Sequence, residues 1–360
     1  MMTPPQPAIL DLFCGCSGFG LGARQAGFAV PLSVDIDPIL TSSHNRNFAG
    51  GELLLADIGK VSADAIADRV GVSIDGIIGG PPCQGFSSIG RSDPSDPRRE
   101  LVGHFFRLVK DVGPRFFVME NVKGLVFSKN RHILDDALDG IRNRYKILDP
   151  IIVDAAQMGA ATRRERVFVI GYDREYVDNI DVTDLDQLRT PATTVGDAIG
   201  DLANAEQVST GDDLWAYADQ DRPSDYALRM RSATGQFTLH RRTPHRNAII
   251  ERFAAVEPGS VDRIGRHPRL SWDGQCPTLR AGTGADKGSY QAVRPIHPSE
   301  PRVITVREAA RLQGFPDSFQ FHPTIWHSFR MIGNSVSPVV ARSLLSLLAS
   351  RMAEPSSAAA

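Results

Sequence analysis

Residues 8 to 22, AILDLFCGCSGFGLG, decide the fold, because a short apolar run leads directly into a glycine-rich turn and a helical pattern. The same alternation of apolar runs with helical patterns continues through RELVGHFFRLVKDV, RFFVMENV and ERVFVIGY, to residue 172. This rhythm is typical of a parallel sheet with crossover helices. The sequence therefore predicts an α/β fold with a doubly wound sheet.

A cofactor site is expected where the carboxyl ends of parallel strands meet the following loops. SVDID, residues 33–37, and LLADI, residues 54–58, place carboxylates and apolar side chains there, suited to a ribose and an adenine. The glycine spacing is not the GxGxxG of dinucleotide folds, which favours a methyl-donor cofactor but leaves a nicotinamide cofactor open. Four glycines in the turn allow close backbone approach to a ligand: Gly15, Gly18, Gly20 and Gly22.

Cys83 is the candidate nucleophile, directly after an apolar strand in GIIGGPPCQGFSSIG, residues 76–90. A thiolate can add to an electron-poor ring carbon such as C6 of a pyrimidine, which makes C5 carbanion-like and able to take a methyl group. Pro81 and Pro82 would stiffen the turn that aims the thiol. The polar loop that follows is rich in Gly, Ser and Pro, as suits a lid that closes on a substrate.

Two further segments supply the acid and the cations that this chemistry needs. FFVMENVKGL places Glu120 and Asn121 at the end of a later strand, where an acid could protonate ring N3 as the thiolate adds. Taken alone, these residues could equally cap a helix. In ATRRERVFVIGY, strand alternation sends Arg164 and Arg166 to one face, a fit for a ring oxygen and a phosphate.

In their linear order these motifs resemble those of the DNA (cytosine-5)-methyltransferases, of the bacterial restriction-modification kind. DLFCGCSGFGLG, GGPPCQGFSS, MENV and TRRERVFVIG are followed by RVITVREAARLQGFPD and MIGNSVSPVVA, so the resemblance covers nearly the whole chain. It implies a Rossmann-like catalytic domain that uses S-adenosylmethionine and releases S-adenosylhomocysteine, and a second, smaller DNA-recognition domain. It also implies methylation of C5 of a flipped-out cytosine in duplex DNA, with no metal.

The resemblance assigns roles to individual residues. Cys83 would attack C6, Glu120 would contact N3 and the exocyclic amine, Arg166 would contact O2, and Arg164 would be a supporting cation. The base that removes the C5 proton is not identified, and an ordered water could serve. The expected cofactor contacts are Phe13, Gly15, Ser17, Gly18, Asp35, Ile36, Asp57, Ile58, Pro82, Asn334 and Ser335.

Three of these positions depart from the usual family pattern. The family usually has glycine where this chain has Ser17, and often glutamate and tryptophan where it has Asp35 and Ile36. Asp35 could still accept ribose hydroxyls through a shorter arm. Ile36 offers apolar packing without aromatic stacking, so we expect weaker cofactor binding but not its loss.

By resemblance the last helix, SPVVARSLLSLLASRM, returns beside the first motif, so the large domain is expected to be discontinuous. We expect a catalytic and cofactor-binding domain at 1–175 plus 326–352, a smaller target-recognition domain at 176–325 and a disordered tail at 353–360.

Charge is distributed unevenly along the smaller domain. Residues 172–228 carry 14 Asp or Glu against 3 Lys or Arg, whereas residues 229–294 carry 5 against 12, although such imbalance also occurs on ordinary solvated surfaces. The basic stretch is expected to face the phosphate backbone. The expected DNA contacts are Gln84, Ser87, Arg91, Arg241, Arg242, Arg246, Arg280 and Lys287.

The composition argues against a membrane protein and against a zinc or disulfide framework. The 360-residue chain is 42% hydrophobic, with no apolar run near the roughly 18 residues of a membrane span and no CxxC pair. We expect a cytoplasmic, monomeric enzyme acting on double-stranded DNA, with any cognate endonuclease acting separately. A tRNA methyltransferase of the same fold stays open, and so does an inactive DNA-binding paralogue. Such a paralogue should have lost Cys83 or Glu120, and both are present.

Overall fold

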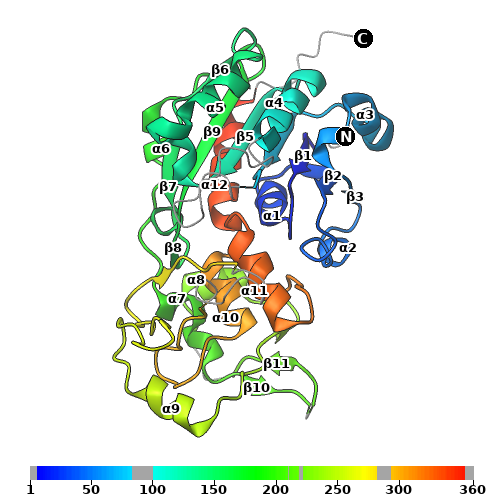
Figure 1. Ribbon diagram of the computed structural model, residues 1–360. Helices are drawn as coiled ribbons and strands as arrows, with labels where there is room; N and C mark the ends of the chain where they lie inside the picture. The colour runs from blue at the N-terminus through cyan, green and yellow to red at the C-terminus, as the bar shows by residue number, and fades with distance from the viewer. Residues whose placement is uncertain (1–5, 83–99, 210, 219–221, 282–292, 353–360) are drawn as a thin grey trace. The chain divides into compact units, whose positions relative to one another are not determined.

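The computed structural model describes residues 6–82, 100–209, 211–218, 222–281 and 293–352 (Figure 1). The chain forms two compact units, each built from separate stretches of sequence. Unit 1 comprises Met1–Asp154, Glu165–Arg189 and Pro338–Ala360, and unit 2 comprises Ala155–Arg164 and Thr190–Ser337.

These units differ in extent from the domains expected from the sequence. Residues 155–164 and 326–337 belong to unit 2, and residues 176–189 belong to unit 1. Pairing of strand β8 (Thr162–Arg163) with β13 (Cys276–Pro277) ties the first segment to unit 2. An ion pair between Arg351 and Asp184 at 2.5 Å, and a bridge between Val177 and Met352, tie residues 176–189 to the carboxyl-terminal helix of unit 1.

Unit 1 is built on a sheet of eight strands in the order β3-β2-β1-β4-β5-β9-β6, with β7 also pairing with β9. Strands β1 to β5 pair in parallel, which confirms the predicted parallel core. The bounds are β1 (Ala8–Leu12), β2 (Ala29–Asp35), β3 (Glu52–Leu55), β4 (Gly76–Gly79), β5 (Phe116–Asn121), β6 (Tyr145–Ile147), β7 (Ile151–Asp154) and β9 (Glu165–Asp173).

Strand β9 runs antiparallel to β5, β6 and β7, so grouping ERVFVIGY with the parallel strands was wrong. The reason is the short connection from β7 to β9, residues 155–164. A parallel crossover needs about a dozen residues or more, usually including a helix, whereas a shorter connection returns the chain in the opposite direction.

Helices cover both faces of this sheet. On one face Leu10 and Leu12 of β1 pack in a core with Phe105 of α4 and Leu134 of α5, and Figure 1 shows α4 and α5 near each other. On the other face α1 packs against α12. The helices of unit 1 are α1 (Gly18–Gln25), α2 (His44–Asn47), α3 (Ala63–Val70), α4 (Glu100–Val112), α5 (Ser128–Asp139), α6 (Val182–Asp186) and α12 (Pro338–Arg351), with 3-10 turns η1 (Ile58–Lys60) and η3 (Lys123–Val126).

The carboxyl-terminal helix packs directly beside the first motif, as the resemblance predicted. A Cβ on Gly22 of α1 would lie 2.3 Å from Cβ of Ala341 in α12, so the close approach requires glycine. The stretch Ile325–Arg351 is long and apolar enough to cross a membrane by length and composition, yet 67% of its most apolar window is buried inside the protein. Burial of that extent is what a core helix shows.

Unit 2 contains short elements around a polar interior. Its strands are β8 and β13, which pair in parallel, and an antiparallel set of β10 (Glu206–Gln207), β11 (Leu214–Ala216) and β12 (Gln236–Thr238). Its helices are α7 (Val195–Ile199), α8 (Asp225–Met230), α9 (Asn247–Ala254), α10 (Val306–Gln313) and α11 (Ile325–Asn334), with 3-10 turns η4 (Ala155–Met158) and η5 (Gly200–Leu202).

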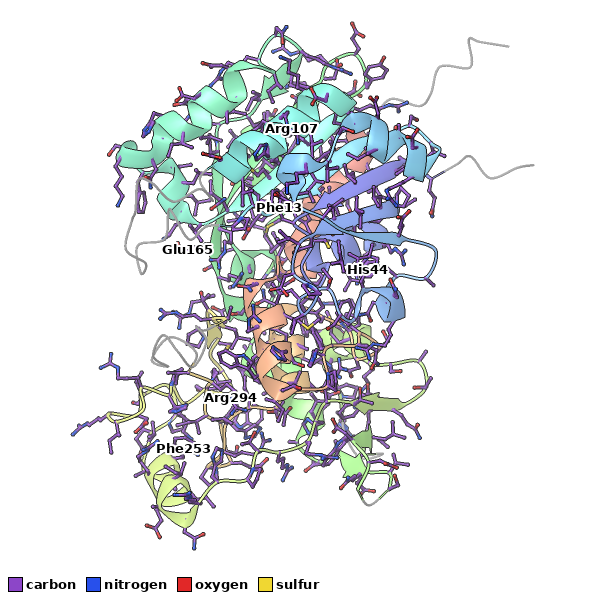
Figure 2. The ribbon with its side chains drawn as sticks, turned by 45° about the vertical axis from the view of Figure 1, so that its right-hand side comes forward. Phe13, His44, Arg107, Glu165, Phe253 and Arg294 are labelled. Carbon is purple, nitrogen blue, oxygen red and sulfur yellow. The ribbon has the colours of Figure 1, made fainter. Side chains whose placement is uncertain are left out.

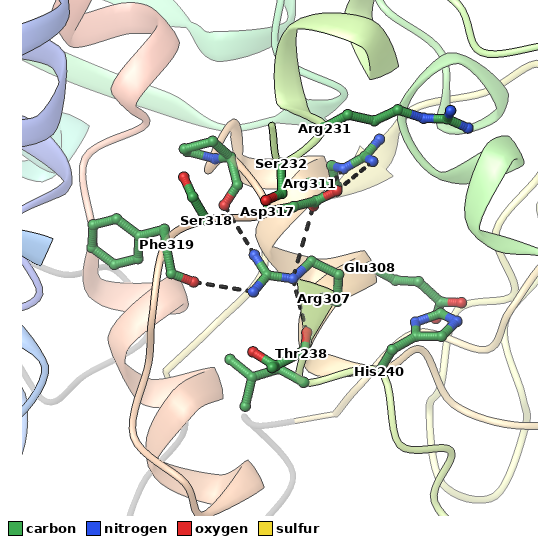
Figure 3. Close-up of polar contacts among 12 residues, drawn as sticks. Arg231, Ser232, Thr238, His240, Arg307, Glu308, Arg311, Asp317, Ser318 and Phe319 are labelled. Atoms are coloured by element: carbon green, nitrogen blue, oxygen red, sulfur yellow. Dashed lines mark hydrogen bonds and ion pairs between the residues drawn. The ribbon is translucent and has the colours of Figure 1, made fainter. Parts of the chain in front are cut away.

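The motif REAARLQGFPD forms the buried centre of unit 2. Arg307 donates to the carbonyls of Thr238, Pro316 and Phe319 at 2.9 to 3.1 Å (Figure 3). Arg311 donates to both carboxylate oxygens of Asp317, at 2.6 and 2.7 Å. Because both guanidinium groups are fully buried and neutralised or hydrogen-bonded, this motif holds unit 2 together.

Candidate cofactor and catalytic sites

The loop after β1 has an unusual backbone. Phe13, Gly15 and Ser17 all have positive φ, at 55°, 53° and 59°, and Figure 2 labels Phe13 in this loop. Ser17 N–H donates to the carbonyl of Cys14 at 2.6 Å, and α1 begins at the next residue. The left-handed conformation at position 17 explains the family's glycine there, since a serine is strained by about 1 kcal/mol or more.

Asp35, at the end of β2, is held toward this loop by backbone donors. Gly15 N–H donates to Oδ2 at 2.8 Å and Asp37 N–H donates to Oδ1 at 2.8 Å. Burial raises the pKa of Asp35, and these amides partly offset that effect. Each carboxylate oxygen can accept a further hydrogen bond, so the side chain can receive two hydroxyl groups of a ribose.

Asp11, one strand residue before the loop, is a second buried carboxyl beside Asp35. It is 1% exposed, and burial and the nearby Asp35 raise its pKa well above the ordinary value. A Cβ on Gly20 would lie 2.7 Å from Asp11 Oδ2, so the start of α1 rests on this carboxyl. The sequence interpretation missed Asp11 because an acid inside an apolar strand gives no sign of the loop that covers it.

The ends of β2 and β3 carry the residues expected to contact an adenine. Ile36 is 69% exposed immediately after β2, and Ile58 is buried after β3. The Asp57 carboxylate accepts from Gly59 N–H at 3.0 Å and caps the turn η1. Arg107 on α4, labelled in Figure 2, donates to the carbonyls of Ile58 and Val61 at 2.9 Å and so fixes this segment.

The ends of β4 and β5 meet at the predicted catalytic edge of the sheet. Asn121 Nδ2 donates to the carbonyl of Pro81 at 3.2 Å, which joins the residues before Cys83 to the end of β5. A Cβ on Gly80 would lie 3.2 Å from Glu120 Oε2, so glycine keeps the space beside this oxygen open. Asn121 therefore positions the turn, a role that its neighbourhood in sequence did not reveal.

Glu120 forms an ion pair with Arg166. Arg166 Nε lies 2.9 Å from Glu120 Oε1, and the two side chains are 20% and 10% exposed. They come from β5 and β9, which are antiparallel neighbours. Tertiary pairing thus brings together two residues that lie 46 positions apart in sequence.

The remaining predicted site residues of the sequence motifs lie in unit 2. Arg164 is buried and donates to the carbonyl of Leu279 at 3.3 Å. Asn334 is exposed at the end of α11, and the Ser335 carbonyl accepts from Gln313 Nε2 at 3.1 Å. A Cβ on Gly333 would lie 2.5 Å from Ala281 N, so the GNSV motif packs on the residues just after Arg280.

The predicted DNA contacts within the described residues have different surroundings. Arg242 forms an ion pair with Glu300, with Nη1 3.0 Å from Oε2. Arg241 donates to the carbonyl of Gly211 at 2.9 Å but stays exposed. Arg246 and Arg280 are also exposed. Arg241, Arg246 and Arg280 are therefore more available to a phosphate than Arg242.

Several residues for which the sequence predicted a role lie outside the described part of the chain. These are Cys83, Gln84, Ser87, Arg91 and Lys287, together with the tail 353–360. Pro82, the last described residue before Cys83, is partly exposed.

Residues 8–349 match the family described as C-5 cytosine-specific DNA methylase. The chain is similar to the type II methyltransferase M.XorII of Xanthomonas oryzae pv. oryzae, with 39% identity over 94% of this chain and 84% of that protein. It is also similar to M.DdeI of Desulfomicrobium norvegicum, with 32% identity over 93% of this chain and 87% of that protein.

Solved structures show the same fold. An E. coli prophage protein described as a DNA modification methyltransferase superposes with a TM-score of 0.81 at 37% identity, covering 96% of this chain and 99% of that one. The Dnmt2 methyltransferase of S. pombe superposes with a TM-score of 0.65 at 19% identity, covering 96% and 99%. The second likeness concerns the fold alone.

Proposed function

The chain belongs to the C-5 cytosine-specific DNA methylases, and on that premise we propose how this DNA (cytosine-5)-methyltransferase works. It transfers a methyl group from S-adenosylmethionine to C5 of a flipped-out cytosine in a specific duplex sequence, through a covalent bond between Cys83 and C6. The observation that carries this proposal is the Glu120–Arg166 pair at 2.9 Å, beside Gly80 and the proline pair that leads into Cys83.

Each of three residues has its own role in the proposed reaction. The Cys83 thiolate forms a bond to C6 while Glu120 holds a proton at N3, so that the negative charge developing on the ring is neutralised. Arg166 donates to O2 and orients the ring. When the C5 proton has left to a base, the electron pair returns to the ring and the bond from Cys83 to C6 breaks. S-adenosylmethionine, when bound, supplies the electrophilic methyl group.

The loop after β1 and the ends of β2 and β3 fit such a cofactor. Asp35 would accept the ribose hydroxyls, since each of its oxygens has an unused acceptor site. Ile36, 69% exposed, would pack on one face of the adenine, and Asp57 with Ile58 would line its edge. Phe13, Gly15, Ser17 and Gly18 would line the loop. Pro82, Asn334 and Ser335 complete the proposed set.

Duplex DNA is the proposed substrate, and a separate endonuclease is the proposed functional partner, since the similar proteins are named type II methyltransferases. Arg241, Arg246 and Arg280 would contact phosphates, in keeping with their exposure. Arg164 would support the site through the segment it holds, at the carbonyl of Leu279.

Transfer of labelled methyl groups to unmethylated duplex DNA and to tRNA, followed by mapping of the modified bases, tests the proposal. We expect label at C5 of cytosine in duplex DNA, and no label with Cys83→Ala, which should still fold and bind the cofactor. Label only in tRNA would overturn the substrate, and undiminished transfer by Cys83→Ala would overturn the mechanism.

A duplex with 5-fluorocytosine at the mapped site tests the covalent step separately. Fluorine cannot leave C5 as a proton does, so the bond between Cys83 and C6 should persist and the complex should survive denaturation. A complex that dissociates in denaturant while the normal duplex is methylated would contradict a covalent step.

A further inference from the structure

The turn Val261–Pro268 of unit 2 exposes an apolar side chain between two arginines. Ile264 is 72% exposed, which is unusual for a large aliphatic residue. Arg263 and Arg266 are exposed on either side of it. Within the described residues neither arginine side chain has a hydrogen bond or an ion pair, so both guanidinium groups are available to a partner.

Buried Asp262 makes this turn rigid. Its carboxylate accepts from Gly265 N–H at 2.7 Å and from Ile264 N–H at 3.3 Å. Its backbone N–H donates to the carbonyl of His267 at 2.8 Å, and its carbonyl accepts from Arg266 N–H at 3.0 Å. Arg266 adopts a left-handed φ of 61°, which closes the turn. The tip is therefore set by its own hydrogen bonds.

The base of the turn is anchored in a small core of unit 2. The rings of His267 and Phe253 lie 5.1 Å apart, and His267 Nδ1 donates to the carbonyl of Arg294 at 2.8 Å. Figure 2 labels Phe253 and Arg294. The Arg269 guanidinium donates to carbonyls at the end of α9, including that of Val256 at 2.8 Å. The tip thus projects from a fixed base.

The one acid in the turn, Asp262, does not offset the positive charge of the two arginines at the surface. Asp262 is 2% exposed, accepts from two backbone N–H groups of the turn, and lies 3.5 Å from Arg252 Nε. The stretch 229–294 around it carries 12 Lys or Arg against 5 Asp or Glu. A polyanion that also offers apolar contact, such as the methyl group of thymine, fits this surface.

We propose that the turn Val261–Pro268 is an element of unit 2 that reads base edges in a groove of duplex DNA. Ile264 makes an apolar contact with a base, while Arg263 and Arg266 contact base edges or the adjoining phosphates. This inference rests on the proposed function, because it needs DNA as the substrate. Rigidity matters here because a turn already ordered in the free protein loses little conformational entropy when it enters the groove.

Selection of bound sequences from randomised duplexes tests this proposal with the full chain, for the unchanged protein and for Ile264→Ser and Arg263→Ala. Val182→Ser is the matched apolar control, because Val182 is 73% exposed in unit 1. Arg174→Ala, at an exposed arginine of unit 1, controls for the loss of one positive charge. Thermal unfolding of each variant checks that the protein stays folded, as expected at exposed positions.

We expect the unchanged protein and both controls to select one sequence. Ile264→Ser should lose about tenfold or more of the preference at one or two base pairs, the usual effect of losing one base contact. Its non-specific binding at low salt should change less than about threefold, because no charge is removed. Arg263→Ala should also lose base preference, and a shallower salt dependence would identify a phosphate contact as well.

Two outcomes would overturn the inference: variants that select the same sequence with undiminished preference, or an unchanged protein that selects no sequence. Failure of the proposed function is visible separately, as binding to a selected sequence without methyl transfer to it.

Discussion

Each unit contains a buried pair of a glutamate and an arginine, and the two pairs differ in how many donors the carboxylate receives. Glu308 in unit 2 accepts from Arg302 Nη1 and Nη2 at 3.0 and 2.8 Å and from Thr305 N–H at 2.7 Å. Glu120 in unit 1 has one ion pair, to Arg166 Nε at 2.9 Å.

Oε1 of Glu120 makes this ion-pair contact without a hydrogen bond from the described residues, and Oε2 faces the space that Gly80 leaves open. Both glutamate side chains are buried, at 10% and 0% exposure, so burial does not distinguish them. The two carboxylates differ in how many acceptor sites receive no hydrogen bond. A carboxylate whose acceptor sites are all hydrogen-bonded stabilises the fold, whereas one with unused acceptor sites can still bind a substrate.

The largest effect is expected for Glu120→Gln on methyl transfer. An amide cannot hold a proton at N3, so single-turnover transfer to duplex DNA should fall by about 10² to 10⁴ fold, the usual range for a general acid. Glu165→Gln is the control, since Glu165 is exposed and pairs with Lys123 at the surface. An unchanged rate for Glu120→Gln would show that Glu120 takes no part in the chemistry. The proposed difference between the Glu120–Arg166 and Glu308–Arg302 pairs would then be wrong.

Glu308→Gln should act on stability instead. Loss of the carboxylate leaves Arg302, 8% exposed, without its main charge partner, which costs about 3 to 5 kcal/mol for a buried pair. Urea unfolding measures this cost. Glu300→Gln is the matched control: Glu300 contacts the same Arg302 but is 31% exposed, so the loss should be under about 1 kcal/mol. Equal losses in the free energy of unfolding for the two variants would mean that burial of the carboxylate does not determine the cost.

The surroundings of Glu308 should also make stability depend on pH. Burial lowers the pKa of His297 to about 4, and its Nδ1 accepts from the backbone N–H groups of Ser299 and Glu300, at 3.3 and 3.1 Å. Below the ordinary His pKa of about 6.5, His297 is therefore protonated in the unfolded chain but stays neutral in the folded chain until about pH 4. The free energy of unfolding should keep its full contribution from neutral His297 above about pH 6.5, and should fall by up to about 1.4 kcal/mol per pH unit on acidification to pH 4.

Urea unfolding at pH 7 and pH 5 measures this loss. Replacing His297 with Gln should reduce the difference between the two pH values, while His132→Gln, at an exposed histidine of α5, should leave it intact. An equal difference in all three proteins would show that other groups cause the acid sensitivity.

The smallest effects are expected from replacing each arginine by lysine. Arg302→Lys loses the two-pronged contact with Glu308 and should cost about 1 to 2 kcal/mol in urea unfolding. Arg166→Lys keeps one positive charge near Glu120 and should lower kcat more than stability. A larger stability loss for Arg166→Lys than for Arg302→Lys would reverse the distinction between the two pairs.

Sequence patterns predicted the parallel core of unit 1 because strand periodicity, glycine-rich turns and strand-end carboxylates are local features. Asp35 illustrates this success: a carboxylate directly after an apolar run must lie at the edge where such strands end. The same reasoning failed for the direction of β9, since pairing partners are not encoded locally. Nor does the sequence show that Arg242, an expected phosphate contact, pairs with Glu300, 58 positions away.

The sequence by itself determined the family and the order of the motifs, because these are properties of residue type and spacing. Only the tertiary structure decided which charged groups are saturated and which keep acceptor or donor capacity. Arg307 and Arg311 are charged residues, yet both are fully buried. Arg263 and Arg266 have the same chemistry and stay exposed on a rigid turn. The difference arises because hydrogen-bond partners come from distant segments that only folding brings together.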